Sequence, residues 1–248
     1  QMSRFKGKRV LITGGTSGIG LATAKRIVDE GGEVAVTGLS QDHLDHAGRE
    51  LPSASLVLRN DAGDPIAAKD LAAKVQEQMD GLDGVFFNAG FGNFRPNEDI
   101  DADHFDAMNT VNVRGPVLQM ASLKPLIKDG GSVLITASVS PYLGQAQGAV
   151  YAGTKGAVTA ISRAWASDLA SRNVRVNTIA PGPIDTNFFG GMDEDEAEDF
   201  KKQIQKQVPL GRVGTSEEVA SVACFLLSDE ATYVTGSEYM VDGGMTLR

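Results

Sequence analysis

Tyr151 and Lys155 are a pair of side chains whose types and spacing could carry chemistry. They lie four residues apart in the run Tyr-Ala-Gly-Thr-Lys, and residues four apart on a helix share one face, about 6 Å from each other. A phenol titrates near ~10 in water, and a cation about 4 Å away at an effective dielectric of ~20 contributes roughly 4 kcal/mol, enough to bring the tyrosine pKa to about 7. The pair could therefore act as a general acid and base, although two ordinary surface residues can have the same spacing.

A glycine-rich turn near the start of the chain is a second candidate site. An apolar run over residues 9–13 predicts a strand, and the spacing of apolar residues after Gly20 predicts a helix. Glycines at 14, 18 and 20 stand between them. Such a turn lets a pyrophosphate approach the backbone closely, and the helix N-terminus supplies amide donors. Because the spacing differs from the common dinucleotide fingerprint, the turn alone is compatible with nucleotide binding or with tight packing.

The composition favours a globular protein that acts on a small molecule. The chain has 248 residues, 42% of them hydrophobic, so it can bury a large core, and we expect one domain over residues 1–248. Its net charge of −9 argues against nucleic acid or a membrane surface as partner. No signal-like start or membrane-length apolar run is apparent, which predicts a cytoplasmic protein. The single cysteine, Cys224, excludes an internal disulfide and is expected to pack in the core.

Predicted strands alternate with predicted helices along the whole chain. The apolar patterns place strands at residues 9–13, 33–38, 54–59, 84–87, 132–136, 174–179 and 238–241. A helix over about 150–171 is expected to bury one stripe, formed by Ala157, Ile161, Trp165 and Leu169. This alternation is typical of an α/β fold with a parallel sheet.

Six motifs in the same order make the chain resemble the short-chain dehydrogenase/reductase family in its compact form. They are the glycine motif at 13–20, Asn88-Ala89-Gly90, Asn112, Ser138 with Tyr151 and Lys155, Pro181-Gly182, and Asp242-Gly243-Gly244. The resemblance covers essentially the whole chain. It implies a single-domain, doubly wound Rossmann fold, with a mainly parallel seven-stranded sheet and helices on both faces. It also implies an NAD(P)-dependent oxidoreductase, and a homotetramer, because tetramers predominate in the family.

The resemblance assigns a catalytic role to four residues. Ser138 is expected to polarise a carbonyl oxygen and Tyr151 to donate the proton. Lys155 is expected to lower the tyrosine pKa and to hold the nicotinamide ribose, while Asn112 kinks its helix and holds a water. The pattern itself places Ser138 just after a strand, where ligands bind in open parallel sheets.

The histidines do not suggest another chemistry. His43, His46 and His104 all fall in early helical or loop segments, so no histidine partner for Ser138 is indicated. We therefore expect neither a serine-hydrolase triad nor a metal site.

The positions that match the family's cofactor-binding residues follow the ends of the predicted strands. They are Gly14, Thr16, Ser17, Gly18, Ile19, Gly20, Gly38, Leu39, Ser40, Asp61, Ala62, Asn88, Ala89, Gly90, Tyr151, Lys155, Pro181, Gly182, Ile184 and Thr186. By resemblance, Asp61 bonds the adenine amino group, although a solvated loop aspartate is the alternative. Ile184 and Thr186 match positions that hold the nicotinamide carboxamide. Asn88 is expected both to connect neighbouring strands and to touch the cofactor.

Cofactor choice should be decided at the end of the second strand. An acid there would bond the ribose hydroxyls and favour NAD, but the chain has Gly38. Family members that use NADP often carry a basic residue at the position of Leu39 or Ser17, and neither is basic here. Thr37, Ser40 and the open backbone at Gly38 could bind a phosphate through neutral hydrogen bonds, so NADP(H) is favoured over NAD(H). Leu39 could equally pack against adenine.

The segment 187–209 is expected to form a lid over the substrate. Phe188, Phe189 and Met192 indicate either an apolar substrate wall or packing anchors of the lid. The acidic run at 193–199 is interpreted as a solvated face rather than a metal site, since acids suit the first turn of a helix.

Two other functions fit the same scaffold. One is an epimerase or dehydratase with a bound nicotinamide, against which the compact length argues. The other is a non-catalytic dinucleotide-binding regulatory or scaffold protein, against which the complete Asn-Ser-Tyr-Lys set argues. The favoured function is an oxidoreductase that transfers hydride between NAD(P)(H) and a small-molecule carbonyl or secondary alcohol.

Overall fold

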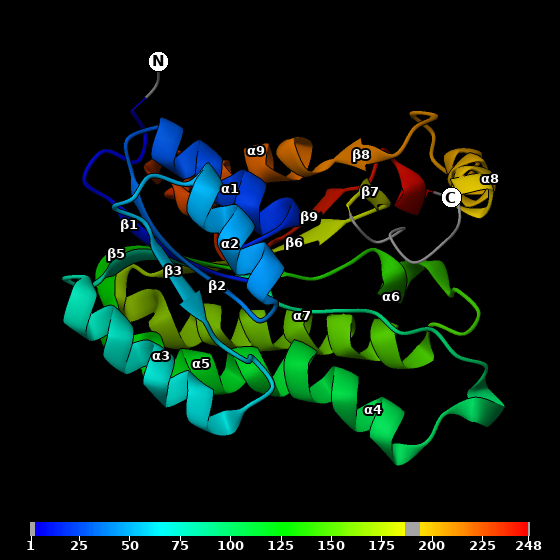
Figure 1. The fold of residues 1–248 in the computed structure, drawn as a ribbon, viewed down its shortest axis with the longest axis horizontal. Coiled ribbons are helices and arrows are strands. Elements are labelled where there is room, and N and C mark those ends of the chain that lie inside the picture. The colour runs from blue at the N-terminus through cyan, green and yellow to red at the C-terminus, as the bar shows by residue number, and fades with distance from the viewer. Residues whose placement is uncertain (1–2, 187–193, 248) are drawn as a thin grey trace.

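One parallel sheet of seven strands runs through the molecule in the order β3-β2-β1-β4-β5-β6-β9 (Figure 1). The computed structural model describes residues 3–186 and 194–247. The strands are β1 Arg9–Thr13, β2 Glu33–Gly38, β3 Leu56–Arg59, β4 Leu82–Phe87, β5 Ile127–Thr136, β6 Arg175–Pro181 and β9 Glu238–Val241. From β1, the chain adds β2 and β3 on one side of the sheet and then β4, β5, β6 and β9 on the other side. This is the doubly wound arrangement that the family resemblance implies.

Helices cover both faces of this sheet. On one face lie α1 Gly18–Asp29, α2 Gln41–Glu50 and α9 Ser216–Leu227, and on the other lie α3 Pro65–Gln78, α5 Gly115–Leu123 and α7 Ala149–Leu169 (Figure 1). The remaining elements are α4 Ala102–Asn109, α6 Ser140–Leu143, α8 Glu194–Gln205, and the short pair β7 Ile184–Asp185 and β8 Gly214–Thr215. The sequence did not predict that pair.

The middle parts of the central strands are mainly apolar because both of their faces are covered. Successive side chains of a strand point to opposite faces, and the two cores divide accordingly. Leu11 packs with the helices α3, α5 and α7, whereas Val10 and Ile12 pack with α1 and α9. Val85 and Phe86 on β4 divide in the same way.

The buried stripe of α7 lies one position away from the predicted one. Of the four predicted residues only Leu169 is fully buried, and Ala157, Ile161 and Trp165 are half-buried. The side chains facing the sheet are those of Val158, Ser162, Ala166 and Leu169. The pattern of large apolar residues was therefore misleading, because a small side chain lets the helix backbone approach the sheet.

Trp165 instead packs at the edge of this stripe. Its ring lies 6.0 Å from the ring of Phe87, centroid to centroid, at a tilted angle. Phe87 is buried in the core.

Four of the predicted strands have other bounds in the structure. β3 begins at Leu56 rather than at residue 54, β4 begins at Leu82 rather than at residue 84, and β6 is Arg175–Pro181 rather than 174–179. β5 begins at Ile127, before an irregularity in its register with β4 between Leu82 and Gly84. The sequence missed this early part of β5 because the glycines and charges at 128–131 break the apolar pattern.

Cys224 lies buried on α9, as expected, and burial raises the pKa of its thiol to about 12. Such a thiol stays protonated and packs as a small apolar group. Among the helices of residues 3–186 and 194–247, none is long and apolar enough to span a bilayer.

Candidate active site

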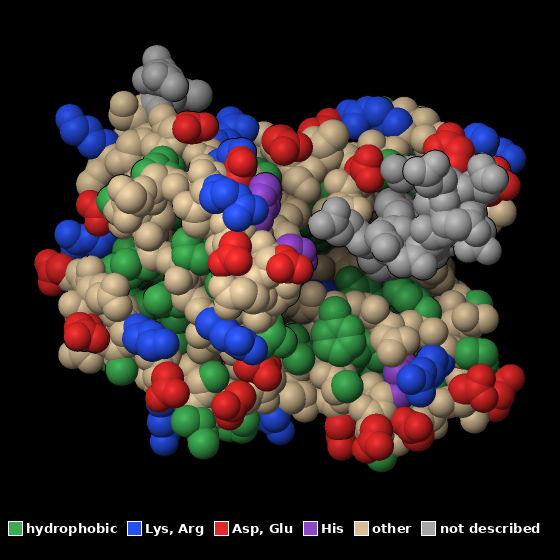
Figure 2. All heavy atoms as spheres, viewed as in Figure 1, with side chains coloured by type: hydrophobic (Ala, Val, Ile, Leu, Met, Phe, Trp, Pro, Cys, Tyr) green, Lys and Arg blue, Asp and Glu red, His purple; other side chains and the backbone are tan. Residues whose placement is uncertain are grey.

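The carboxyl ends of the parallel strands meet at one edge of the sheet, where open α/β sheets bind ligands. The glycine turn follows β1, Gly38 ends β2, Asn88 follows β4 and Ser138 follows β5. On the face shown in Figure 2, the described basic side chains are interspersed with acidic ones, and the surface is hollowed near its centre.

The glycine turn packs directly against the loop after β4. Gly14 has a φ of +60°, and a Cβ there would lie 2.8 Å from the Cα of Ala89. A Cβ at Gly20 would lie 2.2 Å from the carbonyl oxygen of Gly14. Ser17 caps α1 without a side-chain cap bond, so the first amides of α1 stay available to a ligand. This arrangement fits the pyrophosphate of a dinucleotide.

Asn88 ties three strands together. Its Nδ2 donates to the Gly14 carbonyl at 3.0 Å, and its Oδ1 accepts from the Thr136 hydroxyl at 2.8 Å. The Thr13 Oγ1 accepts from the backbone amides of Asn88 and Ala89, at 3.1 and 3.2 Å. Asn88 therefore connects neighbouring strands, as predicted.

Thr13 and Thr136 are supporting residues that the sequence analysis missed. Each is the last residue of a strand, β1 or β5, on either side of β4. Hydroxyls at the ends of two strands that flank an asparagine were the available signal.

Gly38 is glycine for a packing reason. A Cβ at this position would lie 2.2 Å from Oγ1 and 2.8 Å from Cγ2 of Thr16, and Thr16 is itself buried. The side chain of an acid at the end of β2 would therefore collide with the glycine turn.

The two loops next to Gly38 are more open. Leu39 is 53% exposed, and Ser40 precedes α2 without making a side-chain cap bond. Asp61, also exposed, has one carboxylate oxygen held by the Gly63 amide at 2.8 Å. A Cβ at Gly115 would meet the Ala62 carbonyl oxygen at 2.5 Å, so α5 closes against this loop. These positions could flank an adenosine.

Tyr151 lies in the first turn of α7, beside Ser138. The Ser138 hydroxyl lies close enough to the phenol to lower its pKa, and Ser138 is only 8% exposed. The ring of Phe94 packs on that of Tyr151 at a centroid distance of 5.4 Å. A Cβ at Gly92 would lie 3.3 Å from the tyrosine ring, so the loop after β4 covers one of its faces.

Lys155 is a buried cation. Its side chain comes from one turn further along α7, the residue is 5% exposed, and its Nζ donates to the Thr136 carbonyl at 2.9 Å. No carboxylate within residues 3–186 and 194–247 forms an ion pair with it. Burial disfavours the charged form and lowers the pKa of Lys155 to about 8. An ammonium has three donors, so two remain for a ligand such as a ribose.

The expected lowering of the Tyr151 pKa by Lys155 is wrong for this arrangement. Burial raises the pKa of the phenol, and the hydrogen bond with Ser138 offsets only part of that rise. The Lys155 Nζ lies 5.8 Å from the centroid of the tyrosine ring and donates to a carbonyl. The spacing in the sequence showed that the two residues share a face, but it contained no information about burial.

Asn112 lies in a π-helical segment, Thr110–Arg114, between α4 and α5. Its Nδ2 donates to the Phe91 carbonyl at 2.8 Å and to the Thr154 hydroxyl at 3.1 Å, and its Oδ1 accepts from the Phe91 amide at 3.0 Å. The Thr154 hydroxyl in turn donates to the Tyr151 carbonyl at 2.8 Å. Asn112 therefore positions both the loop after β4 and the first turn of α7. Thr154 was not singled out from the sequence, although it lies three residues from the tyrosine.

The segment after β6 reaches back to the glycine turn. A Cβ at Gly182 would lie 2.7 Å from the Cα of Asp242, so Pro181-Gly182 packs on the C-terminal motif. Ile184 is buried, and the nearest atom to a Cβ at Gly18 would be Cγ2 of Thr186, at 3.5 Å. The predicted wall at Phe188, Phe189 and Met192 lies outside the described residues.

Cavities and metal ligands do not identify the site. A hollow of about 550 Å³ lies between α2 and β3, and another of about 450 Å³ lies near β7 and β9. Neither is lined by Ser138, Tyr151 or Lys155. Among the described residues, no three of the types His, Cys, Asp and Glu lie close enough to hold a metal.

Known proteins are similar to this chain in sequence and in fold over nearly their whole length. A family model described as Enoyl-(Acyl carrier protein) reductase matches residues 14–246. Glucose 1-dehydrogenase of Gluconobacter oxydans (strain 621H) is 35% identical to the chain, with 98% of this chain and 94% of that protein covered. The chain is a short-chain dehydrogenase/reductase.

Solved structures of short-chain dehydrogenase/reductases agree with this assignment. One from Serratia marcescens BCRC 10948 has a TM-score of 0.91 at 30% identity, and one from Burkholderia cenocepacia J2315 in complex with NADP has a TM-score of 0.90 at 28% identity. Both alignments cover 98% of this chain and 99% of the other. This short-chain dehydrogenase/reductase is an NAD(P)-dependent oxidoreductase.

The contact between Gly38 and Thr16 can be tested by a double-mutant cycle. Gly38→Ala should lower the free energy of unfolding by about 1–3 kcal/mol, because the new methyl group overlaps the Thr16 side chain. In a Thr16→Ala background the same change should cost less than about 1 kcal/mol. Urea unfolding of the four proteins measures both costs, and equal costs in the two backgrounds would contradict the packing explanation.

The buried lysine should make stability depend on pH. Its pKa is about 8 in the folded enzyme and 10.5 ordinarily, so between these values the unfolded chain binds more protons and the free energy of unfolding rises with pH. The free energy of unfolding of wild type minus that of Lys155→Met should therefore increase by up to about 3 kcal/mol from pH 7 to pH 10. Urea unfolding without added cofactor measures it, with Lys69→Met as the surface-lysine control. A constant difference would show that Lys155 is not buried as a cation.

Proposed function

We propose that this enzyme interconverts a small-molecule carbonyl compound and the corresponding secondary alcohol, using NADP(H). When bound, the nicotinamide supplies or accepts the hydride. The observation that carries the proposal is the Tyr151 phenol, which lies beside Ser138 at the carboxyl end of β5 and one helical turn from the buried Lys155.

Ser138 orients the substrate oxygen in this proposal. Its Oγ accepts from the Ser140 amide at 3.1 Å, which fixes the oxygen and leaves the hydroxyl proton to be donated. A hydrogen bond from a fixed donor stabilises the negative charge that develops on a carbonyl oxygen during hydride addition.

Tyr151 moves the proton. Because burial raises its pKa, the phenol is protonated at neutral pH, which is the form that donates to the substrate oxygen during reduction. In the oxidative direction it must take the proton back, for which a nearby cation helps. Lys155, with a pKa of about 8, still holds most of its charge at neutral pH. Asn112 acts as a positioning residue through Phe91 and Thr154.

We further propose that the enzyme assembles as a homotetramer, which the family resemblance implies. Apolar side chains on the surface support this proposal. Phe105 on α4 is 50% exposed and Val117 on α5 is 36% exposed, and a second copy could cover them.

NADP(H) is the proposed cofactor in preference to NAD(H). The Burkholderia cenocepacia relative was solved with NADP, and the packing of Thr16 against Gly38 leaves no room for the acid that favours NAD. In fluorescence titrations under the same salt, the wild-type enzyme should bind NADPH more tightly than NADH. Tighter binding of NADH would contradict the preference.

Tyr151→Phe tests the proton-transfer role. The variant should lose about 10²–10⁴-fold in kcat, the usual contribution of general acid–base catalysis, while its Kd for NADPH changes by less than about threefold. Tyr233→Phe, on an exposed side chain, is the matched control and should be unaffected. Retained turnover would remove Tyr151 from its role. Cofactor binding by wild type without turnover on any carbonyl substrate would favour the regulatory or scaffold alternative.

A further inference from the structure

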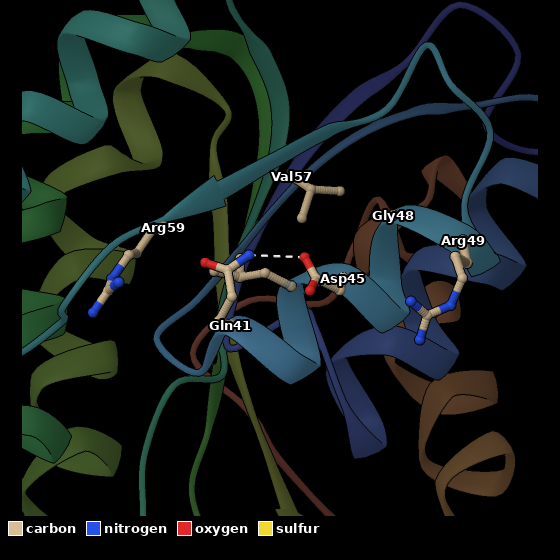
Figure 3. Close-up of a pocket in the computed structure, with 7 residues that line it drawn as sticks. Gln41, Asp45, Gly48, Arg49, Val57 and Arg59 are labelled. Carbon is tan, nitrogen blue, oxygen red and sulfur yellow. Dashed lines mark hydrogen bonds between the residues drawn. The ribbon is translucent and has the colours of Figure 1, made fainter.

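An open hollow between α2 and β3 has an arginine at each end (Figure 3). Arg59, at the carboxyl end of β3, lies beside Gln41 in the first turn of α2, and Arg49 lies at the far end near Gly48. The two arginines thus share one hollow, but only Arg59 lies at the edge of the sheet where the strands end.

The sheet register places Arg59 directly beside Gly38. The two residues are partners in the parallel pairing of β2 and β3, and the Asn60 amide donates to the Gly38 carbonyl at 3.0 Å. Neighbouring strands lie about 4.8 Å apart, which a long arginine side chain easily spans. β3 is the edge strand of the sheet, so no further strand separates Arg59 from solvent.

Arg59 is an exposed cation at the end of the edge strand. Within the part of the chain that the structure describes, its guanidinium makes no hydrogen bond or ion pair. The carboxylate in the hollow, Asp45, accepts instead from the Gln41 Nε2 at 2.8 Å. By contrast, several other arginines of the chain pair with carboxylates: Arg4, Arg9, Arg26, Arg172 and Arg212. In a chain with a net charge of −9, an exposed and unpaired cation here is available to an anion.

The neutral groups expected to bind a 2′-phosphate offer few accessible donors. Thr37 is 2% exposed, so its hydroxyl is closed off from a ligand. Of the groups named from the sequence, only Ser40 retains an exposed hydroxyl. A phosphate monoester carries close to two negative charges at neutral pH, and a net acidic protein would repel it without a local cation.

We propose that Arg59 recognises the 2′-phosphate of NADP(H) from the edge strand. This proposal rests on the proposed function, because it concerns the cofactor of that same site. The planar guanidinium presents several donors in a fork that matches a phosphate, which makes arginine better suited than lysine. Arg59 thereby takes the place of the basic residue that is absent at Leu39 and at Ser17. It makes cofactor specificity depend on β3 rather than on the loop after β2.

Paired titrations of arginine variants with NADPH and NADH, followed by fluorescence at one salt concentration, test this assignment. Arg59→Gln should raise the Kd for NADPH at least about tenfold, the usual effect of losing a charged hydrogen bond, and should change the Kd for NADH less than twofold. Arg59→Lys should fall between wild type and the glutamine variant. Arg49→Gln, the matched control from the same hollow, should leave both affinities unchanged.

The outcomes separate this proposal from the proposed function. The assignment of Arg59 is overturned if wild type prefers NADPH and Arg59→Gln keeps that preference. It is also overturned if the variant loses affinity for both cofactors by the same factor. In either case the proposed oxidoreductase function is unaffected. If wild type prefers NADH, both the 2′-phosphate site and the NADP(H) preference are overturned. Binding of neither cofactor by wild type would contradict the proposed function itself. Higher salt should weaken NADPH binding more in wild type than in Arg59→Gln, since the screened ion pair is absent in the variant.

Discussion

The close packing of the glycine turn after β1 against the loop after β4 is the constraint on which the rest of the site depends. Gly14 and Ala89 approach so closely that no side chain fits between them, and Asn88 is held from both sides by Gly14 and Thr136. These bonds connect the carboxyl ends of β1, β4 and β5. They hold the glycine turn next to the loop after β4 and next to the end of β5, from which Ser138 follows.

The packing around the end of β5 also buries Lys155 and Tyr151 and thereby shifts their pKa values. Lys155 reaches the Thr136 carbonyl from α7, so its ammonium is buried at the end of β5 rather than in water. Burial lowers the pKa of Lys155 and raises that of Tyr151. At neutral pH the phenol is therefore protonated, and the lysine still holds most of its charge. The π-helical turn that holds Asn112 keeps the first turn of α7 in place without adding a charge.

At the carboxyl ends of β2 and β3 the structure is more open, and in our proposal the choice of cofactor there depends on charge. Thr16 fills the space beside Gly38, so a side chain that could bond the ribose hydroxyls is excluded from the end of β2. In our proposal the neighbouring edge strand, β3, provides the cation through Arg59. This division is physically reasonable, because an edge strand can change a side chain at its end without disturbing a buried ladder.

The sequence by itself determined the order of elements, the parallel α/β class and the positions of the glycine turn and of Tyr151, because these depend on periodicity and spacing between residues close in the chain. It also predicted β1, β2 and β9 to the residue. Only the tertiary structure decided that Thr13 and Thr136 support Asn88, that small residues rather than large ones line the sheet side of α7, and that Arg59 lies beside Gly38. Each of these depends on register between residues far apart in the sequence. The direction of the Tyr151 pKa was likewise decided by burial, which arises only when β5, α7 and the loop after β4 close around the phenol.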